Sequence, residues 1–316
     1  MPAATVLIAL AISIPLSAQT ITSFDAPGAG TGVFQGTYAF AIAPSGAIVG
    51  YSRDANNVRH GFIRSNSGSF TSFDAPGAGT AAGQGTRAYS INPTGEITGF
   101  FFDSVNVAHG YVRSNQGVIT VFDAPGAGTG PGQGTFPTGA PQLINANGAI
   151  TGYYFDSADV SHGFLRDRNG VITTFDVPGS GTGFQQGTYG GGFTPRGTIM
   201  GNYVDADNLS HGFLRDENGT FTTFDAPDAG HVPDSDDGTY PFGINANGAI
   251  TGWYVDDSDA NHGFVRDKHG AIVEFDIPGA GAGVFVWSIA PSGSVSGYFW
   301  DANFVIHGFV RGAGGK

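Results

Sequence analysis

Cysteine is absent from this sequence of 316 residues, which excludes disulfide bonds and thiolate metal sites. Charged residues are also scarce: they make up 12% of the chain, whereas a typical soluble protein has roughly a quarter. The formal net charge is −13, so the chain lacks the basic surface that binding to nucleic acid or to anionic membranes requires. We therefore expect no nucleic-acid partner.

Glutamate is nearly absent, with three Glu against 23 Asp. Aspartate favours turns, whereas glutamate favours helices. Glycine and proline together account for 70 residues, and each Gly in a helix interior costs about 1 kcal/mol. Aromatic residues make up 13% of the chain, which excludes a disordered polypeptide. The composition predicts an all-β fold of short strands and many turns.

Long apolar runs are missing, and the one short run, residues 5–16, is followed by Ser17-Ala18-Gln19. This run is shorter than a membrane span, and we interpret residues 1–18 as a signal peptide. The alternative is a buried N-terminal strand or helix. We expect residues 19–316 to form a single secreted domain, extracellular or periplasmic, without a membrane span.

What the sequence does contain is an internal repeat of about 50 residues. The motif Phe-Asp-x-Pro occurs six times, and so does His-Gly followed by Phe or Tyr, at intervals of 45 to 53 residues. The histidines are His60, His109, His162, His211, His262 and His307. The phenylalanines of the first motif are Phe24, Phe73, Phe122, Phe175, Phe224 and Phe275.

The third copy shows how one unit is organised. It contains four candidate strands, a to d: strand a ends near residue 145, and strands b, c and d cover residues 149–156, 162–167 and 171–176. Short turns that end in Asn-Gly join a to b and c to d, which is a strong hairpin signal. Three short antiparallel connections and one long one predict a four-stranded propeller blade.

The two ends of the chain predict how the blades close. The sixth unit stops after its third strand, whereas residues 21–25 match a fourth strand with no other strand before them. We expect this N-terminal strand to complete the last blade, giving a six-bladed β-propeller of four-stranded antiparallel blades without a free edge. The alternatives are a solenoid of stacked hairpins and a different blade boundary.

These motifs also carry a family resemblance. An Asp six residues before His-Gly-Phe-x-Arg, followed by Gly-x-(Ile or Phe)-Thr-x-Phe-Asp-x-Pro-Gly, resembles the bacterial extracellular HAF-type repeat. The resemblance covers residues 21–316. It implies a secreted repeat protein and leaves the ligand open.

The Asp, His and Arg of each unit could form a site. Each His is preceded by an Asp six residues earlier and followed by an Arg four residues later, in all six copies. A catalytic site is normally built once, from non-equivalent positions. We therefore interpret these residues as structural, with the Asp capping the turn between strands b and c.

Asymmetric features are better candidates for function. In a blade, the d–a and b–c loops lie on one face, and we expect the functional site on that face. The loop at residues 225–240 departs most from the repeat, and its Asp234, Asp236 and Asp237 are hard oxygen ligands suited to Ca²⁺. The alternative is a solvated acidic loop, and no other cofactor is expected.

All three tryptophans lie in the last two units, at Trp253, Trp287 and Trp300. Sugar rings stack on aromatic faces, so these residues are candidate ligand-binding positions. Packing between blades is the alternative interpretation.

Together, these features predict a secreted, non-catalytic β-propeller that serves as a binding or scaffold module for an unknown ligand. The partner is an extracellular protein or a glycan, and we expect a monomer. Two alternatives stay open. One is a lectin-like propeller that binds carbohydrate, and the other is a hydrolase or lyase with carboxylates in the central channel.

Overall fold

The computed structural model describes residues 22–194, 196–281 and 283–313. The signal peptide predicted at residues 1–18 lies outside these ranges. Every regular element in them is a β-strand, which confirms the all-β prediction. None of the described residues forms a helix long and apolar enough to cross a membrane.

The described strands fall into six successive units, each an antiparallel meander. Unit 1 contains β1 (Gly36–Ile42), β2 (Ile48–Arg53), β3 (Arg59–Arg64) and β4 (Phe70–Phe73). Unit 2 contains β5 (Gly85–Ile91), β6 (Ile97–Phe102), β7 (Ala108–Arg113) and β8 (Ile119–Phe122). Unit 3 contains β9 (Gly134–Phe136), β10 (Ile150–Phe155), β11 (Ser161–Arg166) and β12 (Ile172–Phe175).

Units 4 and 5 repeat this pattern, and unit 6 has three strands. Unit 4 contains β13 (Gly187–Phe193), β14 (Ile199–Val204), β15 (Ser210–Arg215) and β16 (Phe221–Phe224). Unit 5 contains β17 (Gly238–Ile244), β18 (Ile250–Val255), β19 (Asn261–Arg266) and β20 (Ile272–Phe275). Unit 6 contains β21 (Gly283–Ile289), β22 (Val295–Trp300) and β23 (Ile306–Arg311).

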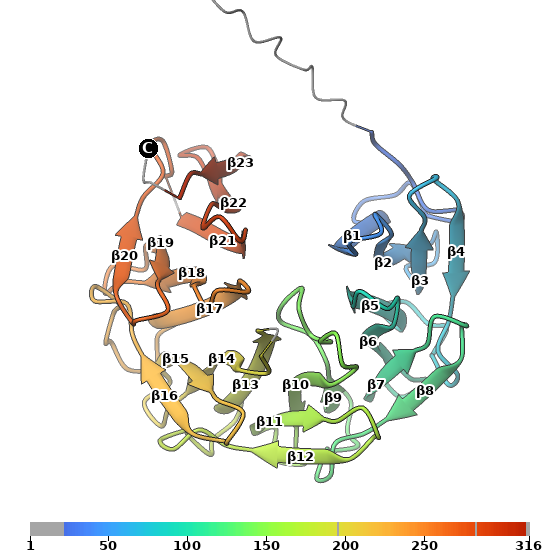
Figure 1. Cartoon of the computed structure of the whole chain (residues 1–316), viewed down its shortest axis with the longest axis horizontal. Helices are drawn as coiled ribbons and strands as arrows, with labels where there is room; N and C mark the ends of the chain where they lie inside the picture. Colours follow the sequence, from blue (N-terminus) through green and yellow to red (C-terminus); the bar gives the residue numbers. More distant parts are fainter. Residues whose placement is uncertain (1–21, 195, 282, 314–316) are drawn as a thin grey trace, which may run out of the picture.

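The units follow one another around a central axis, with the first strand of each innermost and the fourth outermost (Figure 1). The strands predicted for the third unit agree with β10, β11 and β12 to within one residue at each end. The first strand of this unit is shorter than in the others: β9 ends at Phe136, and the chain rejoins the sheet at an isolated bridge between Ile144 and Ile150.

The short turns between the second and third strands are stabilised by the repeated Asp, as the sequence predicts. In the turn between β10 and β11, Asp156 Oδ1 accepts hydrogen bonds from the backbone N–H groups of Ala158 and Val160. Asp159 in this turn has a φ of 61°, a left-handed conformation that Asp and Asn tolerate better than most residues. The repeated Asp at this position is therefore a turn-capping residue, in agreement with the structural interpretation.

In units 1 to 5, the glycine of the His-Gly pair leaves room for the Phe of the Phe-Asp motif. In unit 5, a Cβ atom on Gly263 would lie 2.5 Å from the ring of Phe275, which is directly opposite it in the antiparallel register. The same close approach occurs in units 1 to 4, at Gly61, Gly110, Gly163 and Gly212. Only glycine permits this packing.

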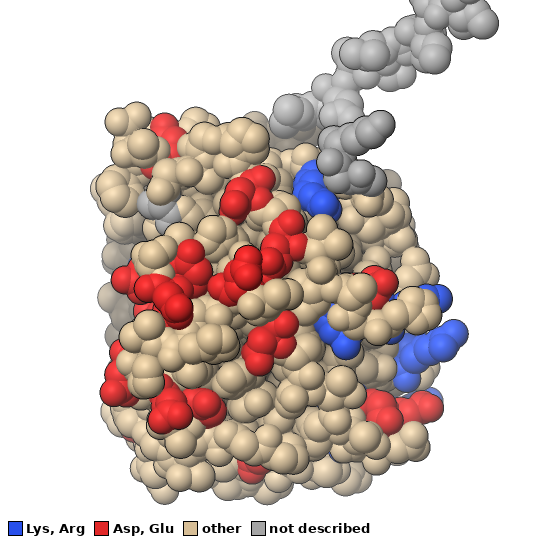
Figure 2. All heavy atoms as spheres, turned by 90° about the vertical axis from the view of Figure 1, so that its left-hand side faces the viewer, with Lys and Arg blue, Asp and Glu red and all other residues tan. Residues whose placement is uncertain are grey.

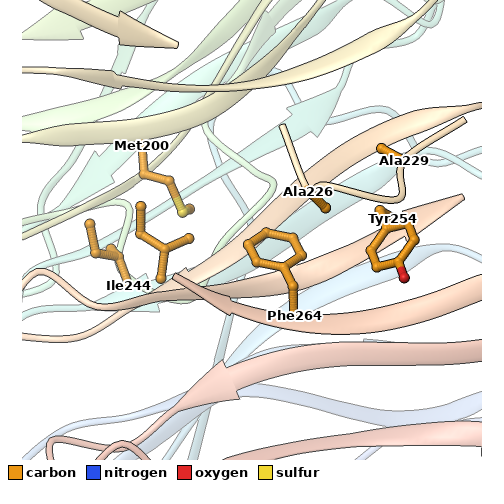
Figure 3. Close-up of a cluster of buried hydrophobic side chains, with 7 residues drawn as sticks. Met200, Ala226, Ala229, Ile244, Tyr254 and Phe264 are labelled. Carbon is orange, nitrogen blue, oxygen red and sulfur yellow. The ribbon is translucent and has the colours of Figure 1, made fainter. Parts of the chain in front are cut away.

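The hydrophobic core lies between units, and Figure 3 shows one cluster of it. Met200 of unit 4 belongs to the same buried cluster as Ile244, Ile250 and Phe264 of unit 5. A single blade cannot bury both of its faces, so each face is covered by the neighbouring unit. Full burial of side chains of this size stabilises the fold by about 1.5–3 kcal/mol each.

The predicted closure of the ring is not present in the structure. Strands β21–β23 form a separate three-stranded sheet, and residues 22–25 form no described strand beside β23. These residues lie against unit 1 instead, where the rings of Phe24 and Phe62 are 6.4 Å apart. The six units thus form an arc that is open between unit 6 and unit 1 (Figure 1).

Candidate functional site

A central cavity of about 820 Å³ is the main candidate site. The inner strands of all six units converge around it, and its walls come from the ends of these strands and from the turns that follow them. It therefore lies toward the a–b turns, at the opposite end of the inner strands from the d–a loops. This position differs from the one expected from the sequence, which was among the d–a and b–c loops.

Residues 137–143 close part of the channel. This loop projects toward the centre of the arc and contacts both neighbouring units (Figure 1). Ser90 of unit 2 donates a hydrogen bond from Oγ to the Pro141 carbonyl at 2.8 Å and accepts one from the Leu143 N–H at 3.1 Å. On the other side, the Phe193 N–H of unit 4 donates to the Gln142 carbonyl at 2.9 Å. The loop is thus fixed as a plug.

The plug arises from an insertion that the repeat spacing already contains. Asn145 follows Gly134 by 11 positions, whereas Asn92 follows Gly85 by seven. The four additional residues account for the interval of 53 between two histidines, the longest in the chain. This interval is visible in the sequence, although the repeat alone does not show where the additional residues lie in space.

Aromatic side chains form another part of the wall. Equivalent positions of the inner strands carry Phe40, Tyr89, Phe242 and Trp287 in units 1, 2, 5 and 6. The rings of Phe40 and Tyr89 are 4.7 Å apart, and those of Phe242 and Trp287 are 4.3 Å apart, both edge-to-face. Phe40 is 39% exposed and Trp287 is 40% exposed, so both rings are open to a ligand.

Among the described residues that line the cavity there is no Asp, Glu, His, Lys or Arg, so this part of the lining carries no charged side chain. Burial raises the pKa of Tyr89 to about 12, so this hydroxyl stays neutral at physiological pH. The carboxylates that a hydrolase or lyase would need in the central channel are therefore not found in this lining.

The amides at the cavity are mostly engaged in holding the turns. Asn145 Oδ1 accepts hydrogen bonds from two turn N–H groups, and Asn245 Oδ1 does the same. The Nδ2 of Asn92 donates to the carbonyl of Asn145 in the next unit at 3.1 Å. Gln142, in the plug, is exposed and carries an amide that is available to a ligand.

The repeated histidines have a structural role, because they contact carboxylates that lie outside their own strand. His211 lies between two carboxylates: its Nδ1 is 2.9 Å from Asp225 and its Nε2 is 3.3 Å from Asp205. The hydrogen bond with Asp225 raises the pKa of His211, and burial opposes this increase. The same pair of carboxylates flanks the histidine in units 1 to 5. Five equal copies fit a structural role better than a catalytic one.

The repeated arginines belong to the contacts between units. Arg266 of unit 5 lies over the ring of Phe224 from unit 4, at 4.7 Å from its centroid. Such cation–π contacts contribute about 0.5–2 kcal/mol. The equivalent arginines contact the preceding Phe in the same way, at Arg64, Arg113, Arg166, Arg215 and Arg311.

The three tryptophans have different surroundings. Trp253 stacks between Tyr240 and Phe242, with centroid distances of 5.9 and 4.8 Å, and serves as packing between strands. Trp287 lies 5.9 Å from Trp253 and lines the central cavity. Trp300 contacts Phe285 at 5.1 Å and is not part of the cavity lining. Of the three predicted ligand-binding residues, one faces the cavity.

Two of the three candidate aspartates in the acidic loop at residues 225–240 use their carboxylates in hydrogen bonds within the protein. Asp237 is 1% exposed and accepts a hydrogen bond from the Val232 N–H at 3.0 Å, and Asp234 accepts one from Asn208 at 2.6 Å. The backbone carbonyl of Asp236 accepts a hydrogen bond from the hydroxyl of Tyr240. Nowhere in the described ranges do three or more His, Cys, Asp or Glu residues gather so as to hold a metal ion. Calcium binding stays a prediction without geometric support.

The d–a and b–c loops do share one face, as the blade topology predicts. The N–H of Gly132 in one d–a loop donates to the carbonyl of Asn106 in a b–c loop at 2.8 Å. All Asp residues except Asp167, Asp216 and Asp267 lie in these loops or where strands enter them. The side of the molecule that carries β16 and β20 accordingly shows many acidic and few basic side chains (Figure 2).

Comparison with known proteins supports the fold. No protein-family model matches the chain, and no curated protein matches it. The structure is similar to a catalytically inactive virginiamycin B lyase from Staphylococcus aureus solved with quinupristin. The TM-score is 0.53 at 18% identity, over 87% of this chain and 85% of that chain.

A second similar structure is TolB from Acinetobacter baumannii, with a TM-score of 0.55, 14% identity, and coverage of 85% of this chain and 61% of that one. A fucose-binding lectin from Aleuria aurantia scores 0.45 at 11% identity, over 88% and 92% of the two chains, which is too low to bear on the fold. The first two are β-propellers, and at these identities they establish a β-propeller architecture alone.

Proposed function

We propose that this chain is a secreted, monomeric six-bladed β-propeller that binds an uncharged ligand with an apolar ring in its central cavity. The observation that carries the proposal is the lining of that cavity: aromatic and aliphatic side chains and neutral amides, drawn from all six units. Ligand pockets of about 300–1,000 Å³ with this composition are typical of small-molecule sites.

The chemistry of the lining favours a neutral ligand. Desolvating a charge inside an apolar cavity costs several kcal/mol unless an opposite charge or a hydrogen-bond network compensates, and this lining offers no opposite charge. Aromatic walls favour rings, which pack edge-to-face or offset against Phe and Trp. The described residues of the lining supply no general acid or base near neutral pH, which supports binding rather than proton-transfer catalysis.

Carbohydrate is the second candidate. Trp287 is 40% exposed and lines the cavity, and the exposed Gln142 adds an amide to the same lining. A sugar ring could stack on the indole and bond to the amide. The resemblance to HAF-type repeats, with the secretion that it implies, is compatible with either ligand.

A fluorescence titration tests the cavity as a binding site. We expect the neutral probe N-phenyl-1-naphthylamine to bind saturably and Trp287→Ala to weaken binding at least about tenfold, because the substitution removes one wall. Phe184→Ala is the matched control, since Phe184 is 69% exposed and lies outside the cavity. Equal binding by both variants would place the site elsewhere. Displacement of the probe by neutral monosaccharides would favour carbohydrate.

A further inference from the structure

The open interface between units 6 and 1 exposes residues that the other interfaces bury. Ile42 of β1 is 67% exposed, whereas its counterparts Ile144, Phe193, Ile244 and Ile289 are 4–7% exposed and Ile91 is half-buried. On the facing side, Val310 of β23 is 79% exposed, while its counterparts in units 1 to 5 are half-buried. Two complementary apolar faces are therefore uncovered, one on each side of the gap.

Residues 22–26 already contact unit 1 as a fourth strand contacts the unit after it. Arg64 lies 4.8 Å from the centroid of Phe24, and the Ala26 N–H donates to Thr37 Oγ1 at 2.8 Å. Between units 4 and 5, Arg266 lies 4.7 Å from Phe224 and the Ala226 N–H donates to Thr239 Oγ1 at 2.9 Å. The segment is thus positioned as the outer strand of a blade that precedes unit 1.

Unit 6 carries a vacant place for such a strand. Gly308 is its His-Gly glycine, and a Cβ atom built there would meet only the Gly297 carbonyl, at 3.9 Å. At Gly263 the same space is filled by the ring of Phe275. A glycine is thus present in unit 6, although no aromatic ring lies over it in the described residues.

The histidine of unit 6 lacks one of its two carboxylates. His307 is 3.5 Å from Asp301, which corresponds to the contact between His262 and Asp256. His262 also contacts Asp276 at 2.6 Å, and Asp276 follows Phe275 in the sequence. No described residue takes that second position at His307, whose side chain is 46% exposed against 19–34% in units 1 to 5. Asp25, which follows Phe24, is the missing counterpart.

We infer that the edge of β23 binds residues 22–25 of the same chain, which closes the ring between units 6 and 1. The register of unit 5 places Phe24 opposite Gly308 and Thr22 opposite Val310, with the Asp25 carboxylate on His307 Nδ1. Closure covers Ile42 and Val310 and completes the wall of the central cavity between Phe40 and Trp287. This inference refines the proposed binding site, and its test needs no ligand.

A cysteine pair tests the pairing directly, because the chain contains no other cysteine. We expect Thr22→Cys with Val310→Cys to form an intramolecular disulfide under mild oxidation. Val265→Cys with Val273→Cys is the positive control, since these residues are partners in unit 5. A disulfide-linked dimer would show that a second copy supplies the strand. Failure to cross-link, when the control succeeds, would also overturn the inference.

A glycine substitution gives a second, independent readout. Gly308→Ala is harmless in an open ring, because its Cβ meets no atom closer than 3.9 Å. In a closed ring it collides with Phe24 and lowers the melting temperature about as much as Gly263→Ala does. An unchanged melting temperature for Gly308→Ala, with a clear loss for Gly263→Ala, would contradict closure. Probe binding plays no part in either readout, so a failure here is distinguishable from a failure of the proposed binding site.

Discussion

The contact between units 4 and 5 differs sharply from the gap between units 6 and 1, although the sequences on both sides are repeats of one another. In the first, Met200, Ile244 and Phe264 form one buried cluster. In the second, Ile42 and Val310 face solvent. The same motif thus occurs with and without its partner. The comparison shows that each unit depends on its neighbours for the burial of both faces.

The largest effect is expected from truncating the apolar residue that follows the inner strand contacts in each unit, which is an isoleucine in all units except unit 4. Ile244→Ala removes a side chain that is 4% exposed and should destabilise the protein by about 2–5 kcal/mol. With a closed ring, Ile42→Ala should cost a comparable amount, measured by urea unfolding. A cost below about 0.5 kcal/mol for Ile42→Ala, the value typical of surface changes, would instead indicate an open interface.

Substitution of a repeated histidine should lower the melting temperature by an intermediate amount that depends on pH. The pKa of His211 is raised by its hydrogen bond with Asp225, so it lies above the unfolded value of about 6.5. The stability that this histidine contributes is fully present below that value and is lost as the pH rises through the raised pKa. His211→Gln should therefore lower the melting temperature more at about pH 6 than at about pH 9.

His307→Gln extends this comparison to the sixth unit. If Asp25 joins His307, His307→Gln should lower the melting temperature about as much as His211→Gln does at the same pH. A clearly smaller loss for His307→Gln would show that His307 keeps a single carboxylate partner.

The cation–π contacts between units should give a smaller loss. Arg266→Leu removes the guanidinium over Phe224 but keeps apolar bulk, and we expect a cost of about 0.5–2 kcal/mol in urea unfolding. Arg168→Leu is the control, because Arg168 is exposed in a turn of unit 3. Equal effects of the two variants would argue against a packing role for the repeated arginines.

The smallest effect is expected from calcium. The carboxylates of Asp234 and Asp237 already accept hydrogen bonds from Asn208 and from the Val232 N–H, so millimolar CaCl₂ should leave the melting temperature unchanged relative to EDTA. An increase that Asp236→Asn abolishes would establish the calcium site instead.

Much of the fold followed from the sequence because its determinants are local. Hairpin turns need Asp, Asn and Gly at fixed positions, and these residues recur in each unit, as at Asp156 and Gly170. The pairing of Gly263 with Phe275 likewise requires both residues, so it leaves a visible repeat. Local hydrogen bonds and close contacts of this kind are encoded within about 20 residues.

The central cavity could not be predicted in this way, because it depends on residues that meet only when the units surround one axis. Phe40 and Trp287 are 247 positions apart in the sequence and line the same space. The length of the d–a and b–c loops suggested a site on their face of the molecule. The loop at residues 137–143, however, makes the opposite end of the innermost strands the most asymmetric part of the structure. Only the interval of 53 between histidines signalled it.

The equivalence of the six interfaces is tested most directly by a distance between turns. Spin labels at Ser45 of unit 1 and Ser292 of unit 6 report on the gap, and labels at Ser45 and Thr94 of unit 2 report on a formed interface. Double electron–electron resonance should give the same distance distribution for both pairs if the ring closes. A clearly longer distance for Ser45 and Ser292 would contradict a closed ring.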